Sequence, residues 1–278
     1  MIKIKSKRGL LVIIGVILIC LTVYALLIEP NLIVTGTVLT LKFSDLPDAF
    51  NGFKIAHIAD THFGMWHLPI RDDIAIQIID DFRPDIIVFT GDIICNVNGI
   101  TDALKFIAHL TSIAPTIIVF GNWDYWSEAN ITELVNQLKE LGAIVLINNS
   151  TIITRGKDEI YVAGVDDPYT WRHDLTRTLS GIPINAFKIL LAHSPQIIRE
   201  ARGKVDLILA GHTHGGQVNI PLLGPLFVPL PPGSRKYVAG VFMENGTIMY
   251  VNRGLGCSMM PIRFMCPPEV ALITLIKD

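Results

Sequence analysis

Residues 207–217, with the sequence LILAGHTHGGQ, constrain the fold most, because four consecutive aliphatic residues stop abruptly at two histidines and two glycines. An apolar run of this length bounded by glycine predicts a β-strand buried on both faces, as in a parallel sheet. Open α/β sheets bind ligands at the carboxyl ends of their strands, which is where His212 and His214 lie. The chain is therefore predicted to be an α/β protein with a polar site at one edge of a sheet.

Four more apolar runs, over residues 53–59, 86–91, 116–121 and 188–192, end in the same way. Any one of them would be unremarkable, since a lone histidine after a strand is commonly only hydrogen-bonded and Gly-Asp is commonly a turn or a helix cap. All of them together, at one edge and without a cation, would leave buried polar groups competing for few partners. The pattern predicts a metal site built from Asp60, His62, Asp92, Asn122, His193, His212 and His214.

The remaining periodicity predicts mixed sheets with helices outside them. Helices are expected over residues 70–82, 101–111, 131–141 and 195–202. Further strands are expected over 31–43 at a sheet edge, and over 143–147, 160–163, 237–241, 248–251 and 270–276. A length of 278 residues, half of them hydrophobic, suffices for one large domain, and a net charge of −2 argues against nucleic acid as a partner.

The N-terminus predicts a membrane anchor over residues 1–30, followed by one domain over 31–278. Residues 9–28 carry no charge, and about twenty apolar residues suffice to cross a bilayer as a helix. A cleaved signal peptide is the rival interpretation. Lys3, Lys5, Lys7 and Arg8 precede the apolar run, which favours a cytoplasmic N-terminus, a single pass through the cytoplasmic membrane and an extracytoplasmic domain. The four cysteines lack the spacing of a disulfide framework.

The blocks Asp-x-His, Gly-Asp, Gly-Asn-x-Asp, His and Gly-His-x-His follow one another in an order that resembles the calcineurin-like metallophosphoesterase family. Beyond these blocks, residues 215–218, 221–233 and 252–263 resemble the membrane-anchored bacterial branch that includes the YkuE-like and YaeI-like phosphodiesterases. The resemblance implies a four-layer α-β-β-α sandwich with two mixed sheets and two divalent metal ions at the sheet edge.

The resemblance also implies a role for each ligand. Asp60, His62 and His214 would hold the first metal, Asn122, His193 and His212 the second, and Asp92 would bridge both. Imidazole with carboxylate and amide suits Mn²⁺, the first expectation, or Fe or Zn²⁺, better than Ca²⁺. Such a pair of ions can hold a hydroxide formed from water and clamp phosphoryl oxygens, so a phosphoric ester hydrolase is expected. Its catalytic residues are expected to be Asp92, Asn122, His193 and His214.

One position departs from the family pattern, which reads Gly-Asn-His-Asp where this chain has Trp123. An indole N–H cannot give up a proton near neutral pH, so a leaving group that departs as a stable anion is favoured. The expected substrate is therefore a pyrophosphate or an activated phosphodiester. The UDP-2,3-diacylglucosamine diphosphatases of lipid A biosynthesis resemble this arrangement, so a lipid-linked phosphorylated substrate and a monomeric enzyme are expected. The alternative is a catalytically impaired, metal-containing binding protein of the cell envelope.

Other residues are assigned less directly. Asn122, Trp123, Arg253 and Arg263 are expected to contact substrate, although each arginine has the alternative of a solvated surface residue. His67 could supply the missing proton donor or be a plain loop residue. Asp124 is expected to orient a neighbour, and His57 to be a structural hydrogen-bonder. Residues 220–232 are too rich in proline for a helix, and they form either a loop packed on the domain or an apolar lid that dips into the membrane beside the site.

Overall fold

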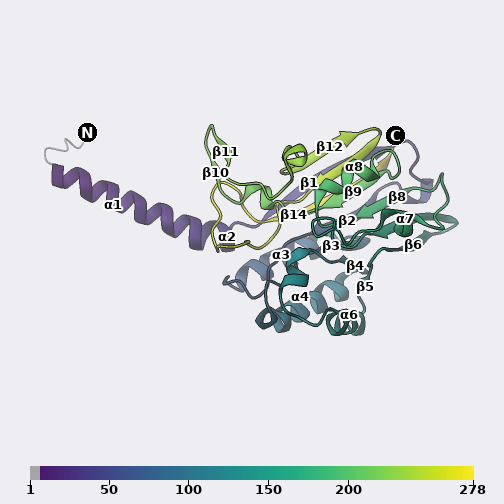
Figure 1. The fold of residues 1–278 in the computed structure, drawn as a ribbon, viewed down its shortest axis with the longest axis horizontal. Coiled ribbons are helices and arrows are strands. Elements are labelled where there is room, and N and C mark those ends of the chain that lie inside the picture. The colour runs from purple at the N-terminus through teal and green to yellow at the C-terminus, as the bar shows by residue number, and fades with distance from the viewer. Residues whose placement is uncertain (1–6) are drawn as a thin grey trace.

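The computed structural model describes residues 7–278, and within that range the strands form two six-stranded sheets and one two-stranded hairpin (Figure 1). The first sheet has the order β1 (Thr35–Phe43), β14 (Glu269–Lys277), β2 (Phe53–Ile58), β3 (Ile86–Thr90), β4 (Thr116–Val119), β5 (Ile144–Val145). The second has the order β12 (Gly240–Glu244), β13 (Thr247–Val251), β9 (Leu207–Ala210), β8 (Lys188–Leu191), β7 (Asp158–Gly164), β6 (Asn149–Arg155). Both are mixed, since β14–β2, β12–β13 and β6–β7 are antiparallel and the other pairs are parallel.

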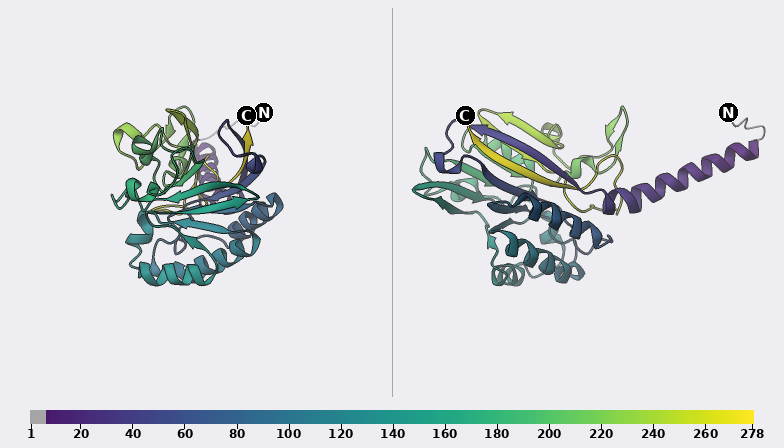
Figure 2. Two further views of the ribbon diagram at one scale, coloured as in Figure 1. Left: turned by 90° about the vertical axis from the view of Figure 1, so that its right-hand side faces the viewer. Right: turned by 180° about the vertical axis from the view of Figure 1, so that it is seen from behind.

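The two sheets pack face to face and helices cover both outer faces, which confirms the predicted four-layer α-β-β-α sandwich. Side chains of one parity fill the space between the sheets, as Ile55 and Leu209 do. Side chains of the other parity, such as Ala56 and Ile208, face the helices, because successive residues of a strand point to opposite faces. Figure 2 shows the helices of the first half on one side of the strands and the segments of the second half on the other.

The helices expected over residues 70–82, 101–111 and 131–141 lie close to their predicted positions. On the first sheet lie α3 (Ile70–Phe82), α4 (Ile100–Ile113) and α6 (Ile131–Glu140), each contributing buried residues to that face. On the second lie α7 (Leu175–Leu179) and α8 (Ile198–Ala201). Short helical segments complete the domain at η2 (Asp48–Phe50), η3 (Val97–Gly99), α5 (Asn122–Trp126), η4 (Pro195–Ile197), η5 (His214–Gly216) and η6 (Pro232–Ser234).

Three sequence-based predictions differ clearly from the structure in their boundaries. The strand expected over 237–241 is β12, which starts at Gly240, because Tyr237 is buried in a turn and its N–H donates to Ser234 O at 3.0 Å. The strand expected from residue 31 starts at Thr35, since Asn31 belongs to α2 (Glu29–Leu32). The helix expected over 195–202 is divided between η4 and α8. The strand β6 and the helix α7 were not predicted.

The N-terminal helix projects away from the domain (Figures 1 and 2). An unbroken helical run comprises α1 (Lys7–Val23), the π-helical turn η1 (Tyr24–Ile28) and α2. Within it, Gly9–Leu32 is long and apolar enough to cross a membrane, by length and composition. Lys3 and Lys5, part of the positive flank on which the predicted orientation depends, lie outside the described residues.

Candidate metal centre

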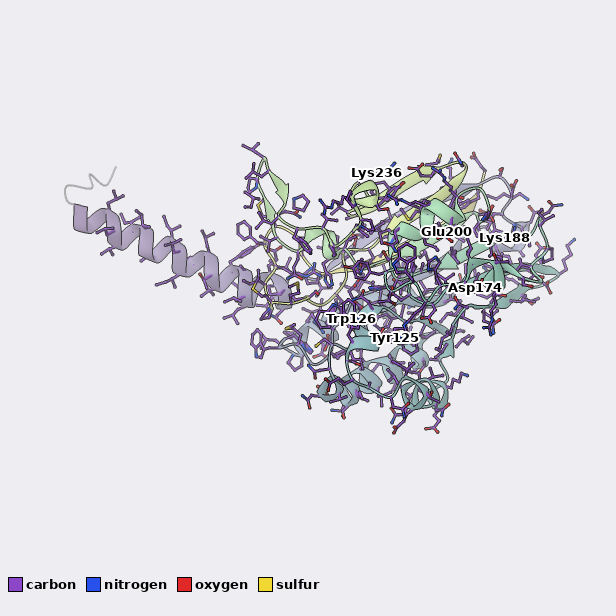
Figure 3. All side chains as sticks on the ribbon, viewed as in Figure 1. Tyr125, Trp126, Asp174, Lys188, Glu200 and Lys236 are labelled. Carbon is purple, nitrogen blue, oxygen red and sulfur yellow. The ribbon has the colours of Figure 1, made fainter. Side chains whose placement is uncertain are left out.

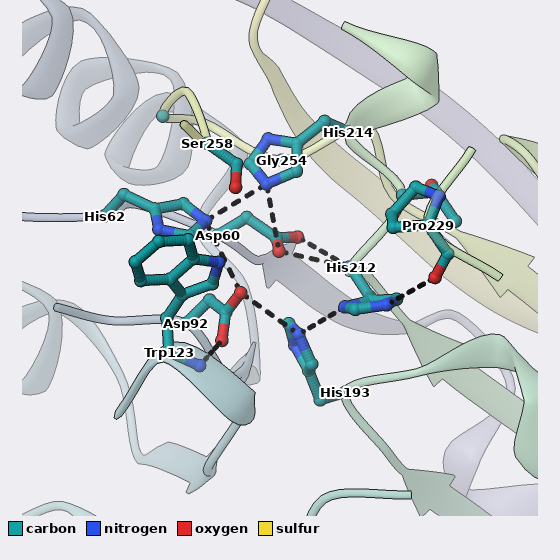
Figure 4. A network of polar contacts seen from close by, with 12 residues as sticks. Asp60, His62, Asp92, Trp123, His193, His212, His214, Pro229, Gly254 and Ser258 are labelled. Atoms are coloured by element: carbon teal, nitrogen blue, oxygen red, sulfur yellow. Dashed lines mark hydrogen bonds and ion pairs between the residues drawn. The ribbon is translucent and has the colours of Figure 1, made fainter. Parts of the chain in front are cut away.

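The ends of neighbouring strands bring together the seven donors predicted from the sequence. In the first sheet β2, β3 and β4 are adjacent and parallel, as β8 and β9 are in the second, so their carboxyl ends meet at one edge. All seven side chains are buried, with His212 the most exposed at 5%. Figure 4 shows six of them converging: Asp60, His62, Asp92, His193, His212 and His214.

The donors fall into two groups of three, one formed by Asp60, His62 and His214 and the other by Asp92, His193 and His212, and in each group the ligand atoms lie within 4.8 Å of one another. The Nε2 atoms of His62 and His214 are 3.0 Å apart. Asp92 lies between the groups, because its Oδ2 is 3.4 Å from His62 Nε2 and 3.2 Å from His193 Nε2. The first group consists of the three residues expected to hold the first metal, and the second combines His193 and His212, expected at the second metal, with the expected bridge Asp92.

Asn122 joins the second group. It is the first residue of α5, and its Oδ1 lies 3.2 Å from His193 Nε2. Acceptor atoms of an amide, a carboxylate and two imidazoles therefore surround the same small volume. This mixture of oxygen and nitrogen ligands suits first-row transition metals.

The hydrogen bonds of two histidines decide which ring nitrogens face the site. His193 donates its Nδ1–H to Thr90 O at 2.8 Å, and His212 donates its Nε2–H to Pro229 O at 2.9 Å. In the neutral rings, His193 Nε2 and His212 Nδ1 then carry lone pairs, and these two atoms face each other at 3.0 Å. Two lone pairs facing each other would repel, and either a proton on His193 Nε2 or a cation bound to both atoms removes that repulsion. The donor set therefore fits a divalent metal ion.

The electrostatics of the site also call for added positive charge. Burial lowers the pKa of His62 to about 4 and that of His212 to about 3, so both rings are neutral at physiological pH. Burial alone would lower the pKa of His193, but the carboxylates of Asp92 and Asp60 raise it to about 10. Burial, aided by Asp92, raises the pKa of Asp60 to about 7. In the protein without metal, protons therefore supply part of the charge that bound cations would supply.

The backbone at the site is strained. Asp60, His62, Asp92, His212 and His214 all adopt positive φ, between 48° and 72°. This left-handed conformation costs a residue other than glycine ~1–3 kcal/mol and persists only where the surrounding structure enforces it. Gly121 leaves room for the arrangement, because a Cβ there would collide with Asp92 Oδ1 and lie 2.7 Å from His193 Cγ. These tight turns aim successive side chains at the same volume.

Asp124 holds two of the ligand-bearing turns together. Its buried carboxylate accepts hydrogen bonds from the N–H groups of Asp92 at 2.9 Å, Ile93 at 2.8 Å, Ile94 at 3.1 Å and Gly121 at 2.8 Å. It thereby fixes the turn after β3 against the start of α5, in agreement with the predicted orienting role. Thr90 O and Pro229 O, which orient His193 and His212, were missed, because backbone acceptors leave no trace in a sequence.

Trp123 borders the site, as its position next to Asn122 requires. Its backbone N–H donates to Asp92 Oδ1 at 2.8 Å. Its indole lies edge-on to the His62 ring, with the ring centroids 5.8 Å apart (Figure 4). Trp126 and Tyr169 extend this aromatic border to His212. Sequence reasoning missed both, although the pair Trp123 and Trp126 in one short helix was a usable indication.

His67 is not turned toward the site. Its ring nitrogens contact Met65 O at 3.0 Å and Asp72 Oδ2 at 2.9 Å. Both nitrogens are thus occupied, which argues against His67 as the missing proton donor. His57 is a structural hydrogen-bonder as predicted, since its Nε2 lies 2.8 Å from Thr90 Oγ1.

The predicted role of Arg263 in gripping substrate conflicts with its position. The side chain is fully buried and donates to the carbonyls of residues 253, 254, 256 and 266. Its Nη2 lies 3.4 Å from His214 Nδ1. Arg253 is paired with Glu269 at 3.3 Å and donates to Thr35 Oγ1 at 3.0 Å. Both guanidinium groups thus organise the loops behind the candidate metal ligands. Their hydrogen bonds within the protein argue against a substrate contact for either arginine.

Comparison with known proteins places the site within a known group. The family described as calcineurin-like phosphoesterase matches residues 53–216. The metallophosphoesterase YkuE of Bacillus subtilis is 34% identical, with 91% of this chain and 88% of the relative covered. The phosphodiesterase YaeI of Escherichia coli is 32% identical, with 81% and 82% covered. A zebrafish transmembrane protein with a metallophosphoesterase domain is 26% identical, with 91% and 62% covered.

Among solved structures, TT1561 of Thermus thermophilus matches with a TM-score of 0.48 and 15% identity. The match covers 74% of this chain and 91% of that chain.

Proposed function

The chain belongs to the calcineurin-like phosphoesterase family, and from this premise we propose that it hydrolyses a phosphodiester or pyrophosphate bond with two divalent metal ions, Mn²⁺ in first place. The family membership makes it a metal-dependent phosphoester hydrolase. Asp60, His62 and His214 would hold one ion, and Asn122, His193 and His212 the other, with Asp92 shared. The observation that carries this assignment is the 3.0 Å approach of His193 Nε2 to His212 Nδ1, with the other nitrogen of each ring hydrogen-bonded to a backbone carbonyl.

When bound, two such ions make a water molecule more acidic and neutralise charge on the phosphoryl oxygens. The chain's own residues position the reaction. Thr90 O orients the imidazole of His193, and Pro229 O orients that of His212. The Asp124 carboxylate and the backbone N–H of Trp123 hold Asp92 in place. Placement before the reaction removes the cost of orienting these groups during it.

Trp123 limits which leaving groups the proposed reaction can release. The indole N–H can donate a hydrogen bond to a leaving oxygen, but it cannot transfer a proton near neutral pH. A nucleotide or phosphate leaving group is a stable anion without that proton, whereas an alkoxide is not. We therefore propose a pyrophosphate or an activated diester as substrate.

A membrane-lipid precursor such as UDP-2,3-diacylglucosamine would meet both this requirement and the presence of an apolar helix at the domain edge. We propose that residues 1–30 anchor the protein as a single pass in the cytoplasmic membrane. The domain over residues 31–278 would lie on the extracytoplasmic side as a monomer.

The test is hydrolysis of bis(p-nitrophenyl) phosphate by the protein loaded with Mn²⁺, compared with Asp92→Ala. Loss of hydrolysis and of metal content is expected in the variant, because Asp92 is placed to serve both ions. Asp102→Ala is the matched control, since that carboxylate is exposed on α4. Full hydrolysis by Asp92→Ala would reject the assignment.

Trp123 also favours a second candidate, a catalytically impaired binding protein of the cell envelope that retains its metals. This candidate requires that the parent protein bind two metals and hydrolyse neither diesters nor pyrophosphates. A panel of sugar-nucleotide pyrophosphates, assayed with the metal-loaded protein, separates the two.

A further inference from the structure

The base of the N-terminal helical run is fixed to the domain and does not act as a tether. Glu29 is fully buried, and its carboxylate accepts hydrogen bonds from the N–H groups of Met265, at 2.8 Å, and Cys266. Asn31 is also buried and accepts from the Leu68 N–H at 2.7 Å. Two separate loops of the domain therefore grip α2, and the axis of α1 has a set direction relative to the sheets.

These contacts reach into the length of helix that a bilayer would enclose. Residues 9–28 span ~30 Å as a helix, which is about the thickness of the hydrocarbon core. Within that stretch, Ala25 O accepts a hydrogen bond from the backbone N–H of Arg263 at 3.0 Å. The ring centroids of Tyr24 and Phe264 are 6.1 Å apart. A bilayer crossed by α1 would therefore begin at the loop that carries Arg263 and Phe264.

An apolar surface surrounds this point. We call it the apolar rim, and its members are large apolar side chains exposed by 51–106%: Trp66, Leu222, Leu223, Leu226, Phe227, Met259, Met260 and Met265. Residues 217–234 and 254–262, which carry most of the rim, contain no charged side chain. Figure 1 shows the hairpin of β10 (Asn219–Ile220) and β11 (Gly224–Pro225) standing beside the base of the helix.

Hydrogen bonds tie the parts of the rim to one another. Asn219 N–H donates to Phe264 O at 2.9 Å, and Gln217 Nε2 donates to Met260 O at 3.1 Å. The same segments reach the metal centre, because Pro229 O accepts from His212 and the Cys266 thiol donates to His214 O at 3.2 Å. The rim and the metal centre are thus two sides of one set of loops.

We propose that the apolar rim is a membrane-contacting surface, which enters the outer layer of the same bilayer that α1 crosses. The bilayer is the occupant because the rim is uncharged over both main segments and continues directly from the anchor helix. Insertion of the rim holds the metal centre close to the lipid headgroups, so an amphiphilic phosphorylated substrate reaches it without leaving the membrane. The membrane contact rests on the proposed function through the anchoring by α1, and the access of an amphiphilic substrate rests on the proposed hydrolysis as well.

Fluorescence quenching of the full chain in lipid vesicles tests the proposal without using activity. A bimane is attached at one cysteine in each of three proteins: the parent, labelled at exposed Cys20 in α1; Cys20→Ala with Leu223→Cys; and Cys20→Ala with Ile184→Cys. Ile184 is 89% exposed and its carbonyl accepts from Lys188, which Figure 3 places at the end of the domain opposite α1. Melting temperatures equal to that of the parent establish that each variant is folded.

The label at position 223 is expected to lie about 5–10 Å below the bilayer surface, so lipids with a shallow nitroxide should quench about half of its fluorescence. Aqueous iodide should quench the label at 184 far more strongly than the label at 223. Equal behaviour of positions 223 and 184 would overturn the proposal. Shielding of position 223 from iodide without quenching by lipid would indicate a protein partner or a second copy, and would overturn it too. If lipid fails to quench the label at Cys20, the anchoring itself fails, and the rim proposal fails with it.

Discussion

In the proposed reaction, Trp123 would determine which leaving groups the site can release, because it stands where the family pattern has a proton donor. Trp123→His is expected to raise turnover of an alkyl phosphomonoester strongly and that of bis(p-nitrophenyl) phosphate little, since only the alkoxide needs the proton. Steady-state kcat for both substrates measures this selectivity. Trp126→His, in the same short helix and more exposed, is the control. An equal effect on both substrates would mean that Trp123 does not govern protonation of the leaving group.

His57 gives the protein a dependence of stability on pH that is separate from its metals. Burial lowers its pKa to about 3 from an ordinary value of 6.5, so the unfolded chain binds a proton that the folded protein rejects. The contribution of His57 is complete above pH 6.5 and is lost as the pH falls toward 3. Between pH 7.5 and pH 5 the loss is about 2 kcal/mol.

In His57→Gln, the fall in the free energy of unfolding between pH 7.5 and pH 5 should therefore be about 2 kcal/mol smaller. Denaturant titrations with chelator present throughout measure it, because metal affinity also varies with pH. Identical falls in parent and variant would show that the folded protein does not keep His57 neutral.

Residue types at strand ends were sufficient to predict seven side chains that the structure brings together, because Asp, His and Asn after buried apolar runs have few other reasons to gather. Sequence could not show how they are aimed. The left-handed backbone at Asp60 and His212 occurs at residues that are not glycine, so composition gives no indication of it. The burial of Arg263 was equally hidden, because its partners are backbone carbonyls of a loop without regular structure.

At the scale of elements, helices and strands with a strong hydrophobic periodicity were predicted correctly, and those with a weak periodicity were not. Helices α3 and α6 match their predicted bounds within a residue, since their apolar positions repeat at helical spacing over a packed face. The strand β6 is half exposed at the edge of its sheet, so it lacks a buried apolar run. The join between η1, α2 and the domain depends on contacts with residues more than two hundred positions away, which no local pattern contains.

This join predicts a sharp boundary of stability. A truncated protein that starts at Tyr24 keeps Glu29 with its two N–H donors, whereas one that starts at Asn31 leaves the Met265 and Cys266 N–H groups without their acceptor. The shorter protein should be less stable by at least ~1 kcal/mol, given ~1–3 kcal/mol for an unsatisfied buried donor such as the Cys266 N–H. Melting temperatures in the same detergent compare them. Glu29→Ala in the longer protein should reproduce most of the loss, and equal melting temperatures would contradict the prediction.

At the scale of the whole molecule, the metal centre links the two sheets, because each group of donors draws on both. Removal of divalent ions by a chelator is expected to abolish hydrolysis and to lower the melting temperature, and Mn²⁺ should restore both. Ligand present at about 1,000 times its Kd stabilises by ~4 kcal/mol, or ~10 °C for a domain of this size. Calorimetry with and without chelator measures the shift. Asp92→Ala should show a smaller shift in melting temperature. If the chelator does not change the melting temperature of the parent protein, the ions do not stabilise the fold.

The pairing of β1 with β14 along nine positions also sets the order of events during synthesis. The strand β14 lies between β1 and β2 and comes later in the sequence than every other described strand. The first sheet therefore cannot be completed until residues 269–277 have been synthesised. A chain synthesised only as far as residue 268 keeps its first sheet open, and deletion of residues 269–277 would leave that gap permanently unfilled.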